Sequence, residues 1–296
     1  MRVAVTGAGG RLGRALVEAL EGAPFAGLSG PIAWTRSDFD LDRPETIHAL
    51  LDRDRPEAVV SAAAWTDVDG CAREPAMARR RNGDAVGVLA AATSGRGIDL
   101  VHLSTNEVFD GRRTDGRGYG PGDETGPINA YGESKLAGEL AAAAAYDGAS
   151  AQFAIVRTAW LYGPPGNDFP AKILAAAERA AGQRLKVVAD EFGSPTFTHD
   201  VADGIVDLLA SGDVGGVHHV VNAGVASRAT WARELFRQLD LDIAVEDVPA
   251  ATWPRASTPP AWGVLAPTLL PSGAPLRQWQ AALADYTPTL LRGVAR

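Results

Sequence analysis

The strongest constraint in this sequence is a glycine pattern that lies directly after its first apolar segment. Residues 2–6 read RVAVT and are followed by GAGGRLG, which places glycines at positions 7, 10 and 13. Where a buried strand enters a helix, such glycines permit a tight turn, a close approach of the backbone to a ligand, and exposure of the first helical amides to an anion. This position favours a dinucleotide-binding turn over an ordinary connection, so we expect Gly7, Gly10 and Gly13 to face a pyrophosphate.

The rest of the first half alternates short apolar segments with longer helical ones. Strands are expected over residues 2–6, 31–35, 58–61, 100–104 and 153–157. Helices are expected between them, over residues 11–21, 45–51, 75–93 and 130–146. This alternation predicts an α/β fold with a Rossmann-type doubly wound parallel sheet, in which ligands bind at the carboxyl ends of the strands.

After residue 157 the regular alternation weakens. Helices are expected over residues 168–181, 199–210 and 228–239, and strands over 185–188 and 217–221. We predict a cofactor domain over residues 1–160, which also receives the strands near 185–188 and 217–221, and a smaller, discontinuous C-terminal substrate-binding lobe formed mainly by residues 161–296. The proline-rich residues 247–275 are expected to be an extended, irregular part of this lobe.

A long loop is expected over residues 110–127, where glycine and charged residues are dense. A loop of this length in a compact enzyme is either a flap beside the site or a plain surface connection. The sequence favours neither alternative.

Charge and cysteine content argue against several classes of protein. A net charge of −8 disfavours nucleic acid or an anionic membrane as the main partner. Cys71 is the only cysteine, so one chain can form neither an internal disulfide nor a cysteine-based metal site. The sequence shows no signal-peptide core and no apolar run of membrane-spanning length, so a cytoplasmic protein is expected.

The end of the second expected strand indicates which dinucleotide is bound. An acidic residue there would accept hydrogen bonds from the adenosine ribose, but the sequence reads WTRS, with Arg36 between two hydroxyl residues. A guanidinium suits a 2′-phosphate, so NADPH is favoured and NADH is kept as an alternative, because Asp38 could reach back to the ribose. Asp40 with Leu41, and the small residues Ala62 to Ala64, lie where later loops would bracket the cofactor.

Tyr131 and Lys135 form a YxxxK motif in the expected helix 130–146. A spacing of four places both side chains on one helix face, where an ammonium would lower the pKa of the phenol so that it can act as an acid. Lys135 could also hold the nicotinamide ribose. Ser104 and Thr105 close the fourth expected strand, which places the Thr105 hydroxyl where it could hydrogen-bond a carbonyl group.

With these residues assembled, the sequence resembles the dTDP-4-dehydrorhamnose reductase family, from the first strand to about residue 265. The resemblance rests on the glycine turn and on five further blocks, which read AAAWTDVD from residue 62, STNEVFDG from 104, YGESKLAGE from 131, RTAWLYG from 157 and DEFGSPT from 190. It implies an NADPH-dependent reduction of the 4-keto group of a nucleotide-linked 6-deoxysugar, such as dTDP-4-dehydro-L-rhamnose or a related deoxysugar.

The resemblance also implies roles for single residues. Thr105, Tyr131 and Lys135 would form the catalytic triad, and Thr105, Asn106 and Trp160 would contact the substrate. Tyr131 and Lys135 would also contact the cofactor, together with Gly10, Arg11, Leu12, Asp40, Leu41, Ala63, Ala64 and Trp65.

Two departures from the family pattern concern the substrate pocket. Asn106 and Glu107 stand where the family usually has Asp-Tyr, which changes charge and bulk beside the sugar. Near the C-terminus the family's Arg-Pro pair is missing, and the nearest arginine is displaced to Arg255. Both departures leave the exact sugar open.

Several alternatives stay open beside the reductase. A dehydratase of the same fold ranks lower, because the amide of Asn106 cannot act as a general acid, and an epimerase ranks lower still. A cofactor-binding regulatory subunit is the alternative from another functional class. No metal site is expected, since His218 and His219 are adjacent on a strand and point to opposite faces, although Glu18 and Glu191 could bind Mg²⁺ at a subunit interface. Whether the chain forms a homodimer is also open.

Overall fold

The centre of the protein is a six-stranded parallel sheet. The computed structural model describes residues 1–25, 30–180 and 182–294. The strand order is β10-β5-β4-β3-β1-β2, and every neighbouring pair is parallel. The strands are β1 (Val3–Thr6), β2 (Ile32–Trp34), β3 (Ala58–Ser61), β4 (Asp99–Thr105), β5 (Phe153–Thr158) and β10 (Gly216–His219). The chain runs from β1 to β2 on one side and then returns to β3 on the other, so the order reverses beside β1, where such sheets bind ligands.

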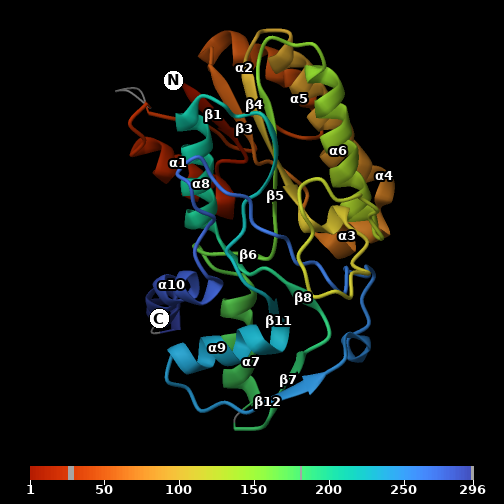
Figure 1. Ribbon diagram of the computed structural model, residues 1–296, viewed down its shortest axis with the longest axis vertical. Helices are drawn as coiled ribbons and strands as arrows, with labels where there is room; N and C mark the ends of the chain where they lie inside the picture. The colour runs from red at the N-terminus through yellow and green to blue at the C-terminus, as the bar shows by residue number, and fades with distance from the viewer. Residues whose placement is uncertain (26–29, 181, 295–296) are drawn as a thin grey trace.

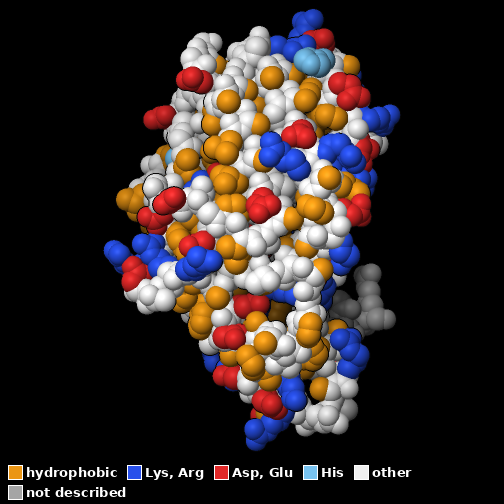
Figure 2. All heavy atoms as spheres, turned by 90° about the vertical axis from the view of Figure 1, so that its right-hand side faces the viewer, with side chains coloured by type: hydrophobic (Ala, Val, Ile, Leu, Met, Phe, Trp, Pro, Cys, Tyr) orange, Lys and Arg blue, Asp and Glu red, His pale blue; other side chains and the backbone are white. Residues whose placement is uncertain are grey.

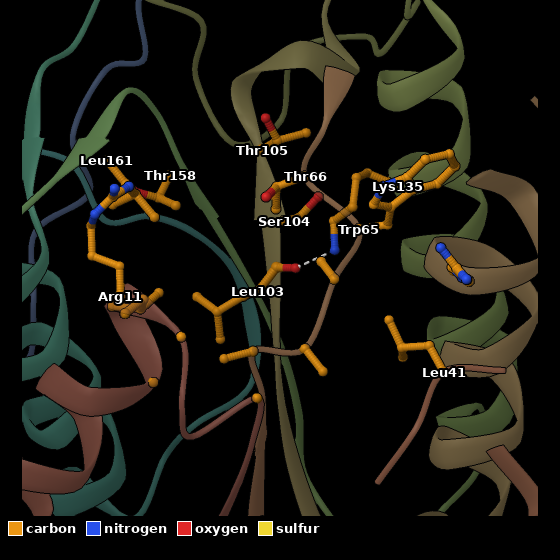
Figure 3. A pocket seen from close by; sticks show the side chains of 18 of the residues that line it. Arg11, Leu41, Trp65, Thr66, Leu103, Ser104, Thr105, Lys135, Thr158 and Leu161 are labelled. Atoms are coloured by element: carbon orange, nitrogen blue, oxygen red, sulfur yellow. Dashed lines mark hydrogen bonds between the residues drawn. The ribbon is translucent and has the colours of Figure 1, made fainter. Parts of the chain in front are cut away.

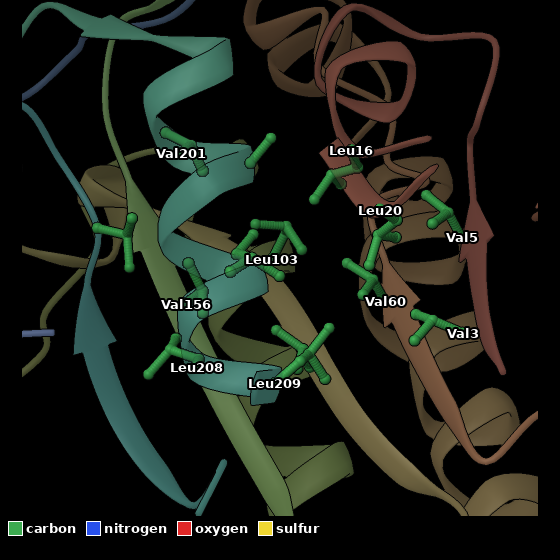
Figure 4. Packing of buried hydrophobic residues seen from close by; sticks show 14 of the residues in the cluster. Val3, Val5, Leu16, Leu20, Val60, Leu103, Val156, Val201, Leu208 and Leu209 are labelled. Carbon is green, nitrogen blue, oxygen red and sulfur yellow. The ribbon is translucent and has the colours of Figure 1, made fainter. Parts of the chain in front are cut away.

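Helices cover both faces of this sheet because its strands are apolar on both sides. Alternate residues of β1 serve different cores: Val3 and Val5 pack with α1 (Arg11–Glu21) and α8 (Thr198–Ser211), as Figure 4 shows, and Ala4 packs on the opposite side. The opposite core is closed by α2 (Ile47–Asp54), α5 (Ala85–Ser94) and α6 (Ala130–Tyr146). The predicted Rossmann-type doubly wound sheet is therefore confirmed.

Two expected helices of the first half are interrupted. Residues 75–93 form a helical rod in three parts, α4 (Pro75–Ala78), the π-helical turn η2 (Arg79–Asp84) and α5, after the short α3 (Val68–Arg73). The segment expected over 45–51 begins as the turn η1 (Pro44–Thr46) and continues as α2. The π turn lies beside α6, and its Asn82 side chain has a role in the site.

The second half builds a separate core below the sheet (Figure 1). Its helices are α7 (Phe169–Ala180), α9 (Arg228–Gln238) and α10 (Trp279–Val294). Its strands pair as β7 (Leu185–Val188) with β12 (Val245–Val248), β6 (Leu161–Tyr162) with β9 (Thr196–Phe197), and β8 (Phe192–Gly193) with β11 (Ala226–Ser227). Residue 181, the last of the helix expected over 168–181, lies outside the described residues.

The expectation that both late strands join the central sheet was half wrong. β10 does pair with β5, as expected for the strand near 217–221. β7 pairs with β12 instead, since its buried Val187 packs in the core of the second half, with α7 and α9, and not against the central sheet. α8 and β10 return from the second half to complete the sheet and its cover.

The loop at 110–127 is held against the C-terminal segment. Tyr119 exchanges backbone hydrogen bonds with Val264 and Ala266, both at 2.8 Å, and its hydroxyl donates to Asp110 at 2.6 Å. Arg113 bridges to Asp123 at 2.7 Å. These contacts favour the surface connection over the flap.

The surface carries charges of both signs. On the face shown in Figure 2, lysine and arginine side chains are interspersed with aspartate and glutamate, and the surface is hollowed between its upper and lower parts. None of the described helices is both long and apolar enough to cross a membrane.

Candidate active site

A cleft of about 950 Å³ opens at the carboxyl ends of the central strands (Figure 3). Its walls come from the segments that follow β1, β2, β3, β4 and β5, together with α6 and the first residue of α9. The site residues expected from the sequence all line it: Gly7, Gly10, Arg11, Leu12, Gly13, Arg36, Asp40, Leu41, Ala63, Ala64, Trp65, Thr105, Asn106, Tyr131, Lys135 and Trp160. No residue of the loop 110–127 is among the described residues that form its wall.

The glycine turn is shaped by close backbone contacts. Gly7 adopts a φ of 66°, and a Cβ there would lie 2.9 Å from the backbone of Ala63. A Cβ at Gly13 would collide with the carbonyl oxygen of Gly7, which also accepts the Gly10 amide at 2.8 Å. The turn therefore presents bare backbone at the start of α1, as a pyrophosphate requires.

The end of β2 presents Arg36 and two hydroxyl groups to the same cleft. Thr35 and Ser37 share a hydrogen bond between their hydroxyl groups at 2.8 Å, and both line the cleft with Arg36. Asp38, the acid that could have faced a ribose, instead accepts the backbone amide and the hydroxyl of Thr35 at 3.0 and 2.9 Å. Asp38 is not among the described residues that line the cleft.

Two residues of the π turn hold Trp65 in the wall of the cleft, and the sequence reasoning missed both. The guanidinium of Arg81 lies 5.3 Å from the ring centroid of Trp65 and binds Asp42 through two hydrogen bonds of 2.8 and 2.6 Å. Asn82 accepts the Trp65 amide at 2.8 Å and donates to Ser134 of α6 at 3.0 Å. No sequence pattern marks either residue, because the π turn that directs them depends on packing against α6.

The YxxxK residues lie in the first two turns of α6, which begins where the Asn129 side chain accepts the Gly132 amide at 2.8 Å. Lys135 is 2% exposed, and its Nζ atom donates to the carbonyl oxygen of Leu103 at 2.7 Å. Its Nζ also lies 3.4 Å from Nε2 of the buried His102. Burial lowers the pKa of Lys135 to about 8.

Tyr131 does not have the lowered pKa that the spacing predicted. Burial raises its pKa above the ordinary value, the nearby Glu107 raises it further, and a hydrogen-bonding interaction with Thr105 opposes these effects. The expectation was wrong because burial has the largest effect on the pKa of Tyr131. The Lys135 ammonium points toward Leu103 (Figure 3) and makes no hydrogen bond to the phenol among the described residues. The phenol therefore carries its proton at neutral pH, but the raised pKa makes it a weaker acid until a cation lies beside it.

A second cavity of about 340 Å³ adjoins the catalytic end of the cleft. Thr66, Val68, Asn106, Glu107, Trp160 and Arg228 line both cavities. Arg228 was missed by the sequence reasoning. Its guanidinium lies 3.6 Å from the centroid of the Trp160 ring. Trp160 adopts a left-handed φ of 43°, and Gly193 has no side chain to block its ring.

The two acidic residues weighed as metal ligands each lie beside a basic side chain. Glu18 lies 3.5 Å from His199, and Glu191 pairs with Arg255 at 3.1 Å. Within residues 1–25, 30–180 and 182–294, no group of three or more His, Cys, Asp or Glu side chains is placed to hold a metal ion.

Comparisons with known proteins agree with this geometry. The sequence model of the family described as RmlD substrate binding domain matches residues 1–291. The chain is 40% identical to a dTDP-4-keto-6-deoxy-D-glucose reductase of Streptomyces niveus, over 97% of this chain and 96% of that one. It is 35% identical to a dTDP-4-dehydrorhamnose reductase of Burkholderia thailandensis, over 98% and 99% of the two chains.

A solved structure extends the likeness to a cofactor complex. A dTDP-4-dehydrorhamnose reductase from Bacillus anthracis, crystallised in complex with NADP, is 28% identical to this chain. It superposes with a TM-score of 0.85 and covers 96% of this chain and 98% of its own.

Proposed function

Because this chain belongs to the family described as RmlD substrate binding domain, we propose that it is an NADPH-dependent reductase that acts on the 4-keto group of a dTDP-linked 6-deoxysugar. The observation that carries the proposal is the convergence of Thr105, Tyr131 and Lys135 in one cleft with the glycine turn. The sugar is dTDP-4-dehydro-L-rhamnose or a related 4-keto-6-deoxysugar.

The residues of the cleft fit a dinucleotide. Gly7, Gly10 and Gly13 leave bare backbone for a pyrophosphate, and the small Ala63 and Ala64 leave room beside it. Ser104 and Thr158 line the cleft with buried hydroxyl oxygens that have no hydrogen-bond partner among the described residues, as expected where a polar ligand binds. Bound NADPH would supply the hydride that reaches C4 of the sugar.

Three side chains would bind the carbonyl oxygen and deliver the proton to it. Tyr131, which keeps its proton at neutral pH, would hydrogen-bond the oxygen and donate the proton as the alkoxide forms. Thr105 would hold the same oxygen with its hydroxyl group. Lys135 would supply positive charge next to the phenol once its ammonium turns from Leu103 to the ribose of the cofactor.

Arg36 supports NADPH over NADH. Its guanidinium lines the cleft beside the hydroxyl groups of Thr35 and Ser37, whereas Asp38 is bound back to Thr35. This arrangement would bind a 2′-phosphate, and the carboxylate of Asp38 is not free for a ribose.

The same proposal assigns a different ligand to each half of the chain. Residues 1–160, completed by β10 and α8, would bind the dinucleotide, and most of residues 161–296 would bind the nucleotide sugar. The shared wall of the two cavities, formed by residues such as Asn106 and Trp160, would then hold the sugar ring.

The direct test is oxidation of NADPH in the presence of dTDP-4-keto-6-deoxy sugars of both C5 configurations, with NADH run in parallel. Turnover of either sugar with a preference for NADPH is expected. Tight NADPH binding without turnover of any sugar would refute the reductase and favour a regulatory cofactor-binding protein.

A further inference from the structure

Glu107 presents a fixed carboxylate beside the catalytic residues. It lies two residues after Thr105, in the turn η3 (Asn106–Val108), and lines both cavities. Its Oε2 atom accepts a hydrogen bond of 2.7 Å from Asn129, the residue that caps α6. Among the described residues, no donor reaches Oε1, so one acceptor oxygen is held in place and left available.

Arg228, which lines the same two cavities, presents the matching donors. It is the first residue of α9, where a positive charge opposes the helix dipole and costs stability. Stacking on Trp160 fixes its guanidinium. Within the described part of the chain, no hydrogen bond or ion pair engages this guanidinium, so its N–H donors are also available.

The surrounding charges indicate a neutral partner for this pair. Arg255 is already paired with Glu191 at 3.1 Å. Asp69 accepts the Ser257 amide at 2.9 Å, and Asp67 caps α3 through the Gly70 amide at 2.9 Å. Four carboxylates and three basic side chains line the second cavity, so it has no excess of positive charge for a phosphate. One free acceptor beside one set of free donors suits a hydroxyl group, which both donates and accepts.

We propose that Glu107 and Arg228 together recognise the hydroxyl group on the sugar carbon next to the keto group, C3, and so restrict the enzyme to keto sugars that carry this group. The inference rests on the proposed function, since Thr105 and Tyr131 must hold the carbonyl oxygen at C4. Of the two carbons bonded to C4, C5 carries the methyl group and the ring oxygen, whereas C3 carries a hydroxyl. A wall with a carboxylate and a guanidinium next to the carbonyl site matches the C3 side.

The test measures kcat/KM for the accepted sugar and for its 3-deoxy and 2-deoxy analogues, in the wild type and in Glu107→Gln and Arg228→Met. The wild type is expected to lose about 100-fold or more on the 3-deoxy sugar, because the two half-buried polar groups are then left without their partner beneath the bound sugar. Each variant should lose about 10- to 100-fold on the parent sugar and on the 2-deoxy sugar. On the 3-deoxy sugar the same variants should differ little from the wild type.

A loss of kcat/KM in the variants that is equally large on the 3-deoxy sugar would overturn the inference, because it would show that Glu107 and Arg228 have a structural or catalytic role. The inference also fails where the penalty disappears with the 2-deoxy sugar instead. Arg233→Met is the matched control: Arg233 lies on α9, is 43% exposed and pairs with Asp247 at 2.6 Å outside both cavities. This variant should keep the wild-type preference among the sugars.

Binding of NADPH, followed by fluorescence, shows that each variant is folded. It also distinguishes failure of the proposed reductase function from failure of the hydroxyl recognition alone. Wild-type protein that binds NADPH but reduces no sugar refutes both the reductase and the hydroxyl recognition. Wild-type protein that reduces the parent and the 3-deoxy sugar equally well refutes only the recognition by Glu107 and Arg228.

Discussion

The Nζ atom of Lys135 donates a hydrogen bond of 2.7 Å to the carbonyl oxygen of Leu103, which joins α6 to the central strand β4. This contact buries an ammonium group at the wall of the cleft, where burial lowers its pKa to about 8. The charged form is thus disfavoured in the folded protein, and the cofactor-free enzyme carries that cost.

Replacement of Lys135 by Met should stabilise the cofactor-free protein at pH 7. The difference between a pKa of about 8 in the folded state and 10.5 in the unfolded state corresponds to a gain of roughly 3 kcal/mol in unfolding free energy. Loss of the hydrogen bond to Leu103 offsets about 1 kcal/mol of this gain. The folded pKa is the lower one, so the wild type gains stability as pH rises from 8 to 10.5, and the advantage of the variant should shrink there. Urea unfolding at pH 7 and pH 10 checks this, and a constant difference would contradict it.

Replacement of Tyr131 by Phe should lower kcat by about 10²- to 10⁴-fold, the usual contribution of a general acid. The affinity for NADPH should change little, because the ring remains and only the hydroxyl is lost. Single-turnover measurements with saturating NADPH check the chemical step directly. Unchanged turnover would remove Tyr131 from the role of proton donor.

Replacement of Arg36 by Ala should weaken NADPH binding by about 10- to 100-fold, as expected for loss of charged hydrogen bonds to a phosphate. Binding of NADH should be nearly unchanged, since it lacks the 2′-phosphate. The ratio of the two dissociation constants is the measurement. Arg43→Ala, outside the cleft wall, is the matched control, and an equal loss for both cofactors in Arg36→Ala would argue against phosphate recognition.

Replacement of Gly13 by Ala should impair both the fold of the glycine turn and cofactor binding. The added Cβ would meet the carbonyl oxygen of Gly7 and the Cα of Ala8, which are backbone atoms that cannot rotate away. A loss of about 1–3 kcal/mol in unfolding free energy is expected, together with weaker NADPH binding. Gly122→Ala, where the Cβ would meet no atom within 4 Å, should leave both properties unchanged.

Replacement of Glu139 by Ala should destabilise the protein by about 3–5 kcal/mol, because it leaves a buried guanidinium without its partner. Arg157 binds Glu139 through two hydrogen bonds of 2.9 and 2.7 Å, and the two side chains are 6% and 2% exposed. Chemical denaturation measures the effect. Asp247→Ala, which breaks the exposed pair with Arg233, should cost less than about 1 kcal/mol, and similar losses for the two variants would contradict the argument.

The sequence by itself determined the central sheet and most of the cleft wall. The glycine turn, the segment after β2 and the YxxxK helix are local patterns, in which spacing along a strand or a helix fixes where side chains point. Residues such as Gly13, Arg36 and Lys135 therefore lie in the cleft, as the pattern predicted. A parallel sheet with apolar strands gathers the segments that carry these residues at one edge.

Only the tertiary structure decided the contacts between distant segments. Strand β7 has an ordinary strand sequence, but its partner β12 follows about 60 residues later and takes it away from the central sheet. The pKa of Tyr131 rises instead of falling because burial and the nearby Glu107 raise it, and no local pattern reports burial. The Lys135 ammonium, which was expected to lower this pKa, binds Leu103 on another element. Arg228 stacks on Trp160 and lines the same cavities as Glu107 only after α9 folds back onto the end of the sheet, so no sequence motif indicates it.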